Sequence, residues 1–190
     1  MTAASQPVAL TCHPQTPAHA VRGITARVRR LPDALLVIAF VLEADLSRLR
    51  IPAPREARMT HGLWEHTCFE AFIALNDTPA YHEFNFAPSS EWAVYAFERY
   101  RKRVPPRDQA VAPAVHVRRL ADRLELDTVV HLNSFSASHS TAALRLALSA
   151  VIEDASGSLS YWALRHPPGT PDFHHGDAFA LTVDSMRDPR

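Results

Sequence analysis

The sequence predicts an all-β protein, an antiparallel β-sandwich of about ten strands with a jelly-roll or immunoglobulin-like arrangement. First, short segments in which apolar and polar residues alternate recur along most of the 190-residue chain, and a period of two is typical of half-buried strands. Second, Pro, Asn, Asp and Ser cluster between these segments, as they do at turns. Third, there is no convincing amphipathic helix, and regularly spaced strands without intervening helices favour a sandwich or barrel.

The N-terminal part of the chain predicts a lead-in followed by a β-hairpin. Residues 1–20 are polar and contain three prolines, with a possible edge strand at Val8–Thr11. Ile24–Val28 alternates inward and outward residues. Ala34–Glu43 is apolar on both faces, which is typical of a central strand that is buried on both sides. The turn Leu31–Asp33 lies between these two strands, so a hairpin is expected.

A long loop, Asp45–Thr60, leads into an aromatic-rich segment, Gly62–Arg101, that predicts a β-meander. Strands are expected at Phe69–Leu75, Tyr81–Phe86 and Trp92–Phe97. The segment holds two of the three tryptophans and five of the nine phenylalanines, mixed with carboxylates and histidines. Unpaired buried carboxylates cost several kcal/mol, so these side chains cannot all face a dry core. One face of this sheet is therefore a candidate binding surface.

The C-terminal half predicts further strands and one short helix candidate. Val115–Arg119 and Leu124–Leu132 alternate around a tight turn and predict a hairpin. Arg103–Asp108, with two adjacent prolines, is expected to be a loop, and Thr141–Leu146 is the helix candidate. The remaining strands are expected at Arg145–Glu153, Leu159–Arg165 and Ala178–Val183.

Length and composition indicate one soluble globular domain, expected over residues 21–190. The formal net charge is zero, so no global charge attracts nucleic acid or an anionic membrane. No apolar run approaches the roughly 20 residues that span a bilayer, and the N-terminus shows no signal peptide; a cytoplasmic location is expected. Cys12 and Cys68 could pair by number alone, but a buried thiol at Cys68 is the expected state.

Three stretches resemble a known family: LWEHTCFEAFI (63–73), YHEFNFAPSSEWAVYAFERYR (81–101) and YWALRHPPGTPDFHH (161–175). They are similar to the DOMON-like proteins related to family 9 carbohydrate-binding modules. In that superfamily a D-x-x-E-like element precedes an aromatic-rich strand and an N-P-x-G-x-like turn. Thr67–Glu70 stands in the place of the first element, Tyr81–Phe86 in that of the strand, and Asn85–Ser90 near the turn. The resemblance implies a β-sandwich with a ligand site on or beside one sheet.

The resemblance also implies what such a site holds. Family 9 modules sandwich a sugar between two tryptophans, so the chain is expected to bind a saccharide or a sugar-containing metabolite without catalysis. Haem-binding DOMON domains use axial Met and His ligands, which makes a haem or redox-cofactor module the alternative, with Met59 as the Met. The acidic loops that hold calcium in family 9 modules are missing from the sequence. No metal or cofactor is therefore expected in the preferred interpretation.

The candidate site residues follow from the chemistry of sugar recognition. A sugar needs flat aromatic faces for its C–H surface and planar polar groups for its hydroxyls. Trp64 and Trp92 are the expected stacking platforms, with Trp162 in reserve. Any single tryptophan is more often a core residue, but Trp64 lies at a loop-to-strand junction among polar residues, which suits the rim of a cleft. The expected hydrogen-bonding and rim residues are Glu65, His66, Glu70, Asn85, Arg165 and His174.

Other interpretations stay open. Glu70 and Glu83 belong to a group of glutamates that could pair across strands, as a glycoside hydrolase requires. A salt bridge of Glu70 with Arg165 or Arg99 explains the same carboxylate structurally. The histidines show no spacing typical of a zinc site. The basic cluster 99–103 is expected to be a solvated rim, with no nucleic-acid partner. The expected partner is a small molecule, and a protein partner is left open and unidentified.

Overall fold

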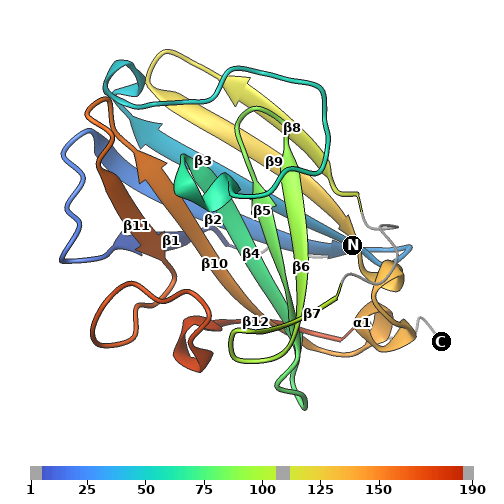
Figure 1. Cartoon of the computed structure of the whole chain (residues 1–190). Coiled ribbons are helices and arrows are strands. Elements are labelled where there is room, and N and C mark those ends of the chain that lie inside the picture. Colours follow the sequence, from blue (N-terminus) through green and yellow to red (C-terminus); the bar gives the residue numbers. More distant parts are fainter. Residues whose placement is uncertain (1–5, 106–111, 186–190) are drawn as a thin grey trace.

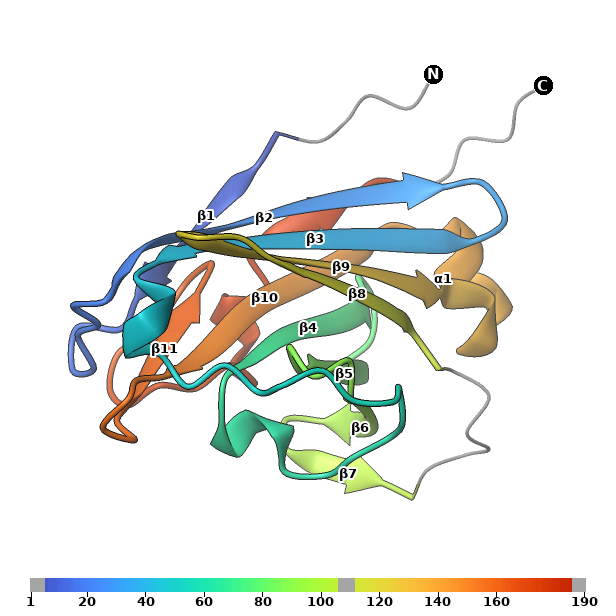
Figure 2. The ribbon, with the colours of Figure 1, turned by 90° about the horizontal axis from the view of Figure 1, so that it is seen from above.

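The computed structural model describes residues 6–105 and 112–185, which form two facing layers of antiparallel strands (Figures 1 and 2). The predicted all-β sandwich is confirmed. Within the described ranges the strands are β1 (Val8–Cys12), β2 (Val21–Leu31), β3 (Leu35–Ala44), β4 (Cys68–Leu75), β5 (Tyr81–Phe86), β6 (Trp92–Arg99), β7 (Lys102–Val104), β8 (Ala114–Arg119), β9 (Arg123–His131), β10 (Leu144–Glu153), β11 (Leu159–Ala163) and β12 (Leu181–Val183).

Strand pairing follows one continuous path that folds into the two layers. Neighbouring strands lie in the order β7-β6-β5-β4-β10-β11-β1-β2-β3-β9-β8, and β12 pairs with the first residues of β10. We call β7-β6-β5-β4-β10-β11 the front sheet and β2-β3-β9-β8 the back sheet. The predicted meander is the β4–β5–β6 part of the front sheet, and the predicted hairpins are β2–β3 and β8–β9.

β1 joins the two sheets, because its two halves pair with different layers. Val8–Leu10 pairs with β2 in the back sheet. Thr11 and Cys12 pair with β11 in the front sheet. The strand was expected at the edge of a sheet, and this expectation is wrong: β1 has a hydrogen-bonded neighbour on each side. A single short strand therefore closes one side of the sandwich.

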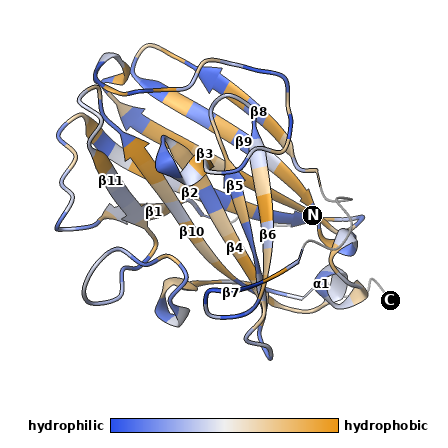
Figure 3. Ribbon diagram, in the orientation of Figure 1, coloured by the Kyte–Doolittle hydropathy of each residue, from blue (hydrophilic) through white to orange (hydrophobic). Residues whose placement is uncertain are grey.

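The main core lies between the sheets. In β2 the alternate residues Ile24, Ala26 and Val28 are buried while the residues between them are exposed. Phe40 of β3 meets Phe69 of β4 across the two layers, with ring centroids 5.2 Å apart. Figure 3 shows the alternation of hydrophobic and hydrophilic residues along strands such as β9. Each strand thus places one face in the core, as the period of two predicts.

The front sheet is also covered on its outer face, which the back sheet is not. Every residue of β4 except Leu75 is buried. A second hydrophobic cluster lies on that outer face; its buried members are Leu63, Cys68, Phe72, Ala74, Tyr81, Ala87, Ala93, Tyr95, Phe97, Ala147 and Ala178. Leu63 belongs to the short 3-10 helix η2 (Leu63–Glu65), and Ala178 belongs to η4 (Gly176–Ala178). Two loops therefore pack on this face and build walls around part of it.

The closing strand predicted at Ala178–Val183 is shorter in the structure, because Ala178 ends η4 and β12 begins at Leu181. Two other predicted elements differ because of strand pairing. The helix lies at α1 (Ala137–Thr141), earlier than the candidate Thr141–Leu146, because Leu144–Leu146 pairs with both β4 and β12 and so extends β10. The predicted loop Arg103–Asp108 begins instead within β7, which pairs with β6; its residues from 106 lie outside the described part of the chain. In both cases pairing with a neighbouring strand overrides the local pattern.

Both cysteines are free, and Cys68 is buried as predicted. In the part of the chain that the structure describes, no helix is long and apolar enough to cross a membrane.

Candidate functional site

A hollow of about 390 Å³ opens on the outer face of the front sheet, a volume within the range of small-molecule sites. We call it the aromatic hollow. Its aromatic lining residues are Trp64, Tyr95, Phe97, Tyr161 and Phe173, and its charged or ionisable ones are Glu70, Glu83, Arg101, Arg103 and His174. The floor comes from β4, β5 and β6. The walls come from η2 and from the segment between β11 and η4.

Strand register brings the two glutamates together on the floor. Glu70 of β4 lies opposite Asn85 of β5, so Glu83, two residues earlier on β5, lies diagonally beside it on the same face. Diagonal neighbours on adjacent antiparallel strands are within reach of long side chains. Glu83 in turn lies opposite Tyr95 of β6. Three consecutive strands therefore present Glu70, Glu83 and Tyr95 to one hollow.

Both carboxyl groups are buried and incompletely paired. Glu70 is 3% exposed and Glu83 is 6% exposed. Burial raises the pKa of Glu70 well above its usual value, and the charge of Glu83 raises it further. Burial also raises the pKa of Glu83, against the lowering effects of its hydrogen bond from Asn85 and of the nearby Arg103 and Arg101. Because each carboxylate disfavours ionisation of the other, the pair retains a proton more readily than either group would alone.

Asn85 lies on the same face of β5 as Glu83 and supports it from the side, but it does not itself line the aromatic hollow. It is fully buried, and its Nδ2 donates to Oε1 of Glu83 at 2.7 Å. The thiol of Cys68 lies 3.7 Å from Oδ1 of Asn85. Ser149 of β10 donates to Oε2 of Glu70 at 3.5 Å, a long hydrogen bond. The expected partners of Glu70 were Arg165 or Arg99, and this is wrong: neither is among its interactions, and Ser149 takes their place.

The aromatic wall centres on Tyr95. Trp64 is 39% exposed and meets the Tyr95 ring edge to face, with centroids 5.7 Å apart. The guanidinium of Arg103 lies over the Tyr95 ring, 3.5 Å from its centroid. Gly62, which immediately precedes η2, has a φ of 78° and so lies in the left-handed region that favours glycine. That turn brings Trp64 back over the sheet, so an indole stands at the mouth of the hollow.

His174 closes the hollow from the loop before η4. Tyr81 accepts a hydrogen bond from the backbone N–H of Arg101, and its hydroxyl lies 2.8 Å from Nδ1 of His174. If Tyr81 donates to Nδ1, the ring proton is on Nε2, which lies 3.6 Å from Glu83 Oε2. Burial lowers the pKa of His174 to about 4, with a contribution from the charge of Arg101. The imidazole is therefore neutral near pH 7, and its contact with Glu83 is not an ion pair.

Trp92, an expected stacking platform, and Trp162, the reserve, lie in the core between the sheets and do not line the aromatic hollow. They are 9% and 7% exposed. On β6 the residues that face outward are Ala93, Tyr95 and Phe97, so Trp92 faces inward by the strand's period of two. Trp162 also faces inward and donates from Nε1 to Ser160 Oγ at 3.1 Å. The expectation that two tryptophans form the site is corrected: Trp64 is the one tryptophan in the hollow.

Three other predicted residues lie outside the hollow. The carboxyl group of Glu65 lies beside Gly62 and is exposed. His66 is exposed, and its Nδ1 lies 2.8 Å from Oε2 of Glu153, a buried carboxylate that also pairs with Arg50 at 2.9 Å. Arg165 is exposed and follows β11. None of the three is among the residues that line the aromatic hollow.

Sequence reasoning missed several residues that line the hollow. Tyr95 and Phe97 could have been found, because the pairing of β5 with β6 places them on the same outward face as Glu83. Arg103 was expected to be a solvated rim residue, and it is exposed but also covers Tyr95. Phe173 lies next to His174 in a loop. Its position depends on how that loop packs, and no local pattern indicates it.

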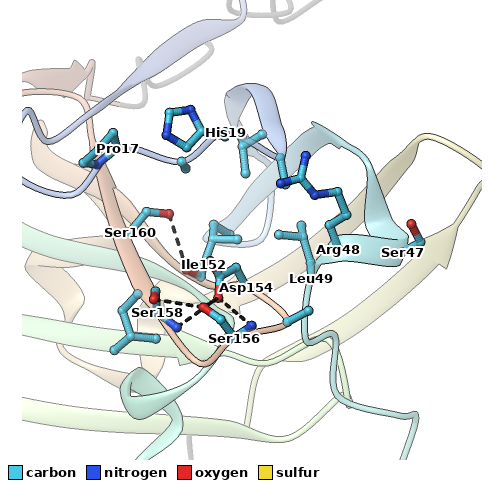
Figure 4. A pocket seen from close by; sticks show the side chains of 15 residues that line it. Pro17, His19, Ser47, Arg48, Leu49, Ile152, Asp154, Ser156, Ser158 and Ser160 are labelled. Atoms are coloured by element: carbon cyan, nitrogen blue, oxygen red, sulfur yellow. Dashed lines mark hydrogen bonds between the residues drawn. The ribbon is translucent and has the colours of Figure 1, made fainter.

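A second hollow of about 330 Å³ lies where the β1–β2 connection meets the turn between β10 and β11 (Figure 4). Several of its polar groups are engaged in hydrogen bonds within the protein. Oδ1 of Asp154 accepts from the backbone N–H groups of Ser156 and Ser158 and from the Ser156 hydroxyl. Ser160 donates to the carbonyl of Ile152 at 3.3 Å. None of the predicted site residues lines it, so the aromatic hollow is the candidate site.

The geometry also bears on a haem site and a metal site. Met59, the residue named for axial haem ligation, packs against the main core and forms a backbone bridge to Trp92. It does not line the aromatic hollow, so the residues do not fit a haem that is bound there. Over residues 6–105 and 112–185, no group of three or more His, Cys, Asp or Glu side chains is arranged to hold a metal ion.

The sequence matches no protein-family model and no curated protein. The structure is similar to a proposed carbohydrate-binding protein from Bacteroides uniformis, with a TM-score of 0.63, 13% identity, and coverage of 90% of this chain and 82% of that one. It is also similar to a family 9 carbohydrate-binding module from Caldicellulosiruptor kristjanssonii in two complexes. The glucose complex gives a TM-score of 0.61 at 10% identity, covering 100% and 87% of the two chains. The cellotriose complex gives 0.54 at 10% identity, covering 94% and 76%.

At identities of 10–13% these similarities show a shared fold and leave the ligand open. The relation to family 9 modules that the sequence resemblance implied is thereby supported at the level of the fold. The DOMON-like assignment stays a prediction. The chain has the sandwich architecture of the carbohydrate-binding proteins to which it is similar.

Proposed function

We propose that this chain is a non-catalytic carbohydrate-binding domain whose ligand, a saccharide or a sugar-containing metabolite, occupies the aromatic hollow. One observation carries the proposal: an exposed indole, Trp64, stands over a floor that contains two buried carboxyl groups, Glu70 and Glu83. A sugar ring has an apolar C–H face and a polar edge, and this hollow offers a partner to each.

The polar contacts in the proposal come from residues that other side chains already orient. Glu83 is held by Asn85 at 2.7 Å, and Glu70 accepts from Ser149 at 3.5 Å. Both carboxyl groups still have oxygen atoms that can accept from hydroxyls, since each has about four lone-pair sites. Arg103 lies at the mouth and donates in the plane of its guanidinium. The fold shared with proteins named for carbohydrate binding supports the same ligand class.

The placement of the glutamates favours binding over hydrolysis. Glycoside hydrolysis uses two carboxyl groups that flank the scissile bond, one of them protonating the leaving group. Glu70 and Glu83 project from neighbouring strands of one sheet face and meet a ligand from the same side. A ligand that rests on this floor has both carboxyl groups beneath it. We therefore propose recognition without bond cleavage.

Calorimetric titration with glucose and cellotriose tests the proposal. We expect saturable binding of at least one of them, and about fivefold weaker binding by Trp64→Ala, because loss of a stacking ring costs about 1 kcal/mol. Leu120→Ala is the matched control, since Leu120 is also an exposed large apolar residue but lies in the β8–β9 turn of the back sheet. Its affinity is expected to equal that of the wild type.

Three results would contradict the proposal in different ways. Binding that is unchanged in Trp64→Ala would mean that the site lies elsewhere. Absence of binding to either sugar would remove the support for these saccharides as ligands. Release of glucose from cellotriose during long incubation, detected by chromatography, would contradict the proposal that the domain is non-catalytic.

A further inference from the structure

Glu70 is the least exposed ionisable group that lines the aromatic hollow, and within residues 6–105 and 112–185 it has no cationic partner. Its side chain is almost completely buried yet lines the hollow. Its one hydrogen bond described above is the long contact from the Ser149 hydroxyl. The two arginines of the hollow act elsewhere: Arg101 pairs with Asp172 at 2.8 Å, and Arg103 covers the Tyr95 ring.

The surroundings of Glu70 make the ionised form costly. Burial and the charge of Glu83 both raise the pKa of Glu70, and the weak hydrogen bond from Ser149 lowers it. The arginines lower the pKa of Glu83 but not that of Glu70. The other titratable groups that line the hollow are Tyr95, Arg101, Arg103, Tyr161 and His174, and Cys68, Tyr81 and Asp172 lie close to them. Burial and the neighbouring carboxylate therefore favour a protonated carboxyl pair in the empty hollow.

A ligand with a positive charge would replace that proton. A neutral hydroxyl can bond to the carboxyl pair but brings no positive charge that would favour its ionisation in a buried place. An ammonium group supplies both the hydrogen bonds and the charge. The rings of the hollow suit a cation as well: Arg103 already lies over Tyr95, 3.5 Å from the ring centroid, in a cation–π arrangement.

We propose that the aromatic hollow selects saccharides that carry a protonated amine, that is, amino sugars, whose ammonium group lies against Glu70 between the two floor carboxyls. This inference rests on the proposed function and narrows its ligand class. The step balances as an exchange: the ammonium group keeps its three protons, Glu70 goes from carboxylic acid to carboxylate, and the released proton passes to the buffer.

The test compares glucosamine, N-acetylglucosamine and glucose by calorimetry at about pH 6.5, in two buffers that differ in ionisation enthalpy. The three sugars share one ring, but only glucosamine carries a charge. We expect glucosamine to bind at least about tenfold more tightly than the other two. We also expect close to one proton released per glucosamine bound, seen as a heat that depends on the buffer, and none with glucose.

Glu70→Gln tests the residue. It keeps the shape of the side chain and removes its charge, so the ratio of glucosamine affinity to glucose affinity should fall at least about fivefold towards one, and proton release should vanish. Glu125→Gln changes a carboxyl group of β9 in the back sheet and should keep the wild-type ratio. Thermal unfolding of both variants shows whether they are folded, and the proton count on the wild type stands whether or not Glu70→Gln folds.

The outcomes separate the two proposals. Equal affinity for glucosamine and glucose, with no proton released, overturns the amine preference and leaves saccharide binding intact. A preference that persists unchanged in Glu70→Gln overturns the assignment to Glu70. Failure of all three sugars to bind overturns the saccharide proposal itself, and the amine preference falls with it.

Discussion

Arg30 connects three segments at one end of the sandwich, and replacing it with methionine is expected to destabilise the fold substantially. Its Nη1 donates to the carbonyl oxygens of Ala142 at 2.6 Å and Asp184 at 3.0 Å, and its Nη2 donates to that of His139 at 2.6 Å. The guanidinium sits on the inward face of β2 and is buried. It thereby connects β2 to α1, to the residues before β10 and to the end of β12.

The expected loss can be worked out from these three bonds. A hydrogen bond from a charged donor contributes about 1.5–3 kcal/mol, so three contribute roughly 4.5–9 kcal/mol before costs. Methionine removes the buried charge as well, and this recovers a desolvation cost of several kcal/mol. The three carbonyl oxygens lose their donors in the variant. A net loss of about 3 kcal/mol in the free energy of unfolding follows.

Urea denaturation followed by tryptophan fluorescence measures the loss. With a slope of about 1–3 kcal/mol per molar urea, the midpoint should fall by about 1–3 M. Arg29→Met is the control, because Arg29 is the neighbouring residue on β2 and is exposed; its midpoint should stay within about 0.3 M of the wild type. Equal midpoints for Arg30→Met and Arg29→Met would refute the reasoning that the buried guanidinium secures this end.

Three further predictions concern the core, the response to pH and one long loop. Trp162→Ala should lower the free energy of unfolding by about 3–5 kcal/mol, since it empties a core site, whereas Trp64→Ala should cost under about 1 kcal/mol. Burial lowers the pKa of His82 from 6.5 to about 4, so as the pH falls the unfolded chain takes up this proton before the folded chain does. The free energy of unfolding is therefore unaffected by His82 above about pH 6.5 and falls by about 3 kcal/mol towards pH 4. His82→Phe should remove that part of the acid sensitivity. Glu91→Ala should speed tryptic cleavage within 49–62, because Glu91 binds side chains of that loop.

Each of these has a result that would count against it. Comparable losses for the two tryptophan variants would contradict their placement in the core and at the hollow. Equal acid sensitivity of the His82 variant and the wild type, measured by urea midpoints at pH 7 and about pH 4.5, would exclude His82 as a source. Unchanged cleavage in Glu91→Ala, compared with Glu43→Ala on the exposed side of β3, would show that the loop is held by other contacts.

The period of two predicted most of the strands, because alternation records which side of a strand meets the core. It predicted β4, β5 and β6 nearly to the residue. It could not say which side of β4 faces the back sheet, since Phe69 and Phe72 are both apolar and both buried, one in each cluster. In a strand covered on both faces, the pattern does not indicate which face meets the back sheet.

The site was predicted in part for the same reason. Trp64, Glu70 and His174 line the aromatic hollow, while Trp92 and Trp162 occupy the core. If the orientation of one residue of β6 had been known, the period of two would have excluded Trp92 from the outer face. The sequence alone does not tell which face of the strand any residue occupies. His174 reaches the floor of the hollow from a loop, and the position of a loop residue relative to a sheet cannot be read from the sequence, which gives only the residue type. Tertiary packing decides the rest.

The position of β1 has a consequence for association between molecules. Because Val8–Cys12 completes a hydrogen-bond ladder in each layer, detaching this one segment would bare the edges of β2 and β11 at the same moment. Free edges recruit strands from other chains, and the vacant slot would accept the same five residues from a second copy. Reciprocal exchange of that short ribbon would then produce intertwined dimers, at the cost of breaking few contacts in either subunit.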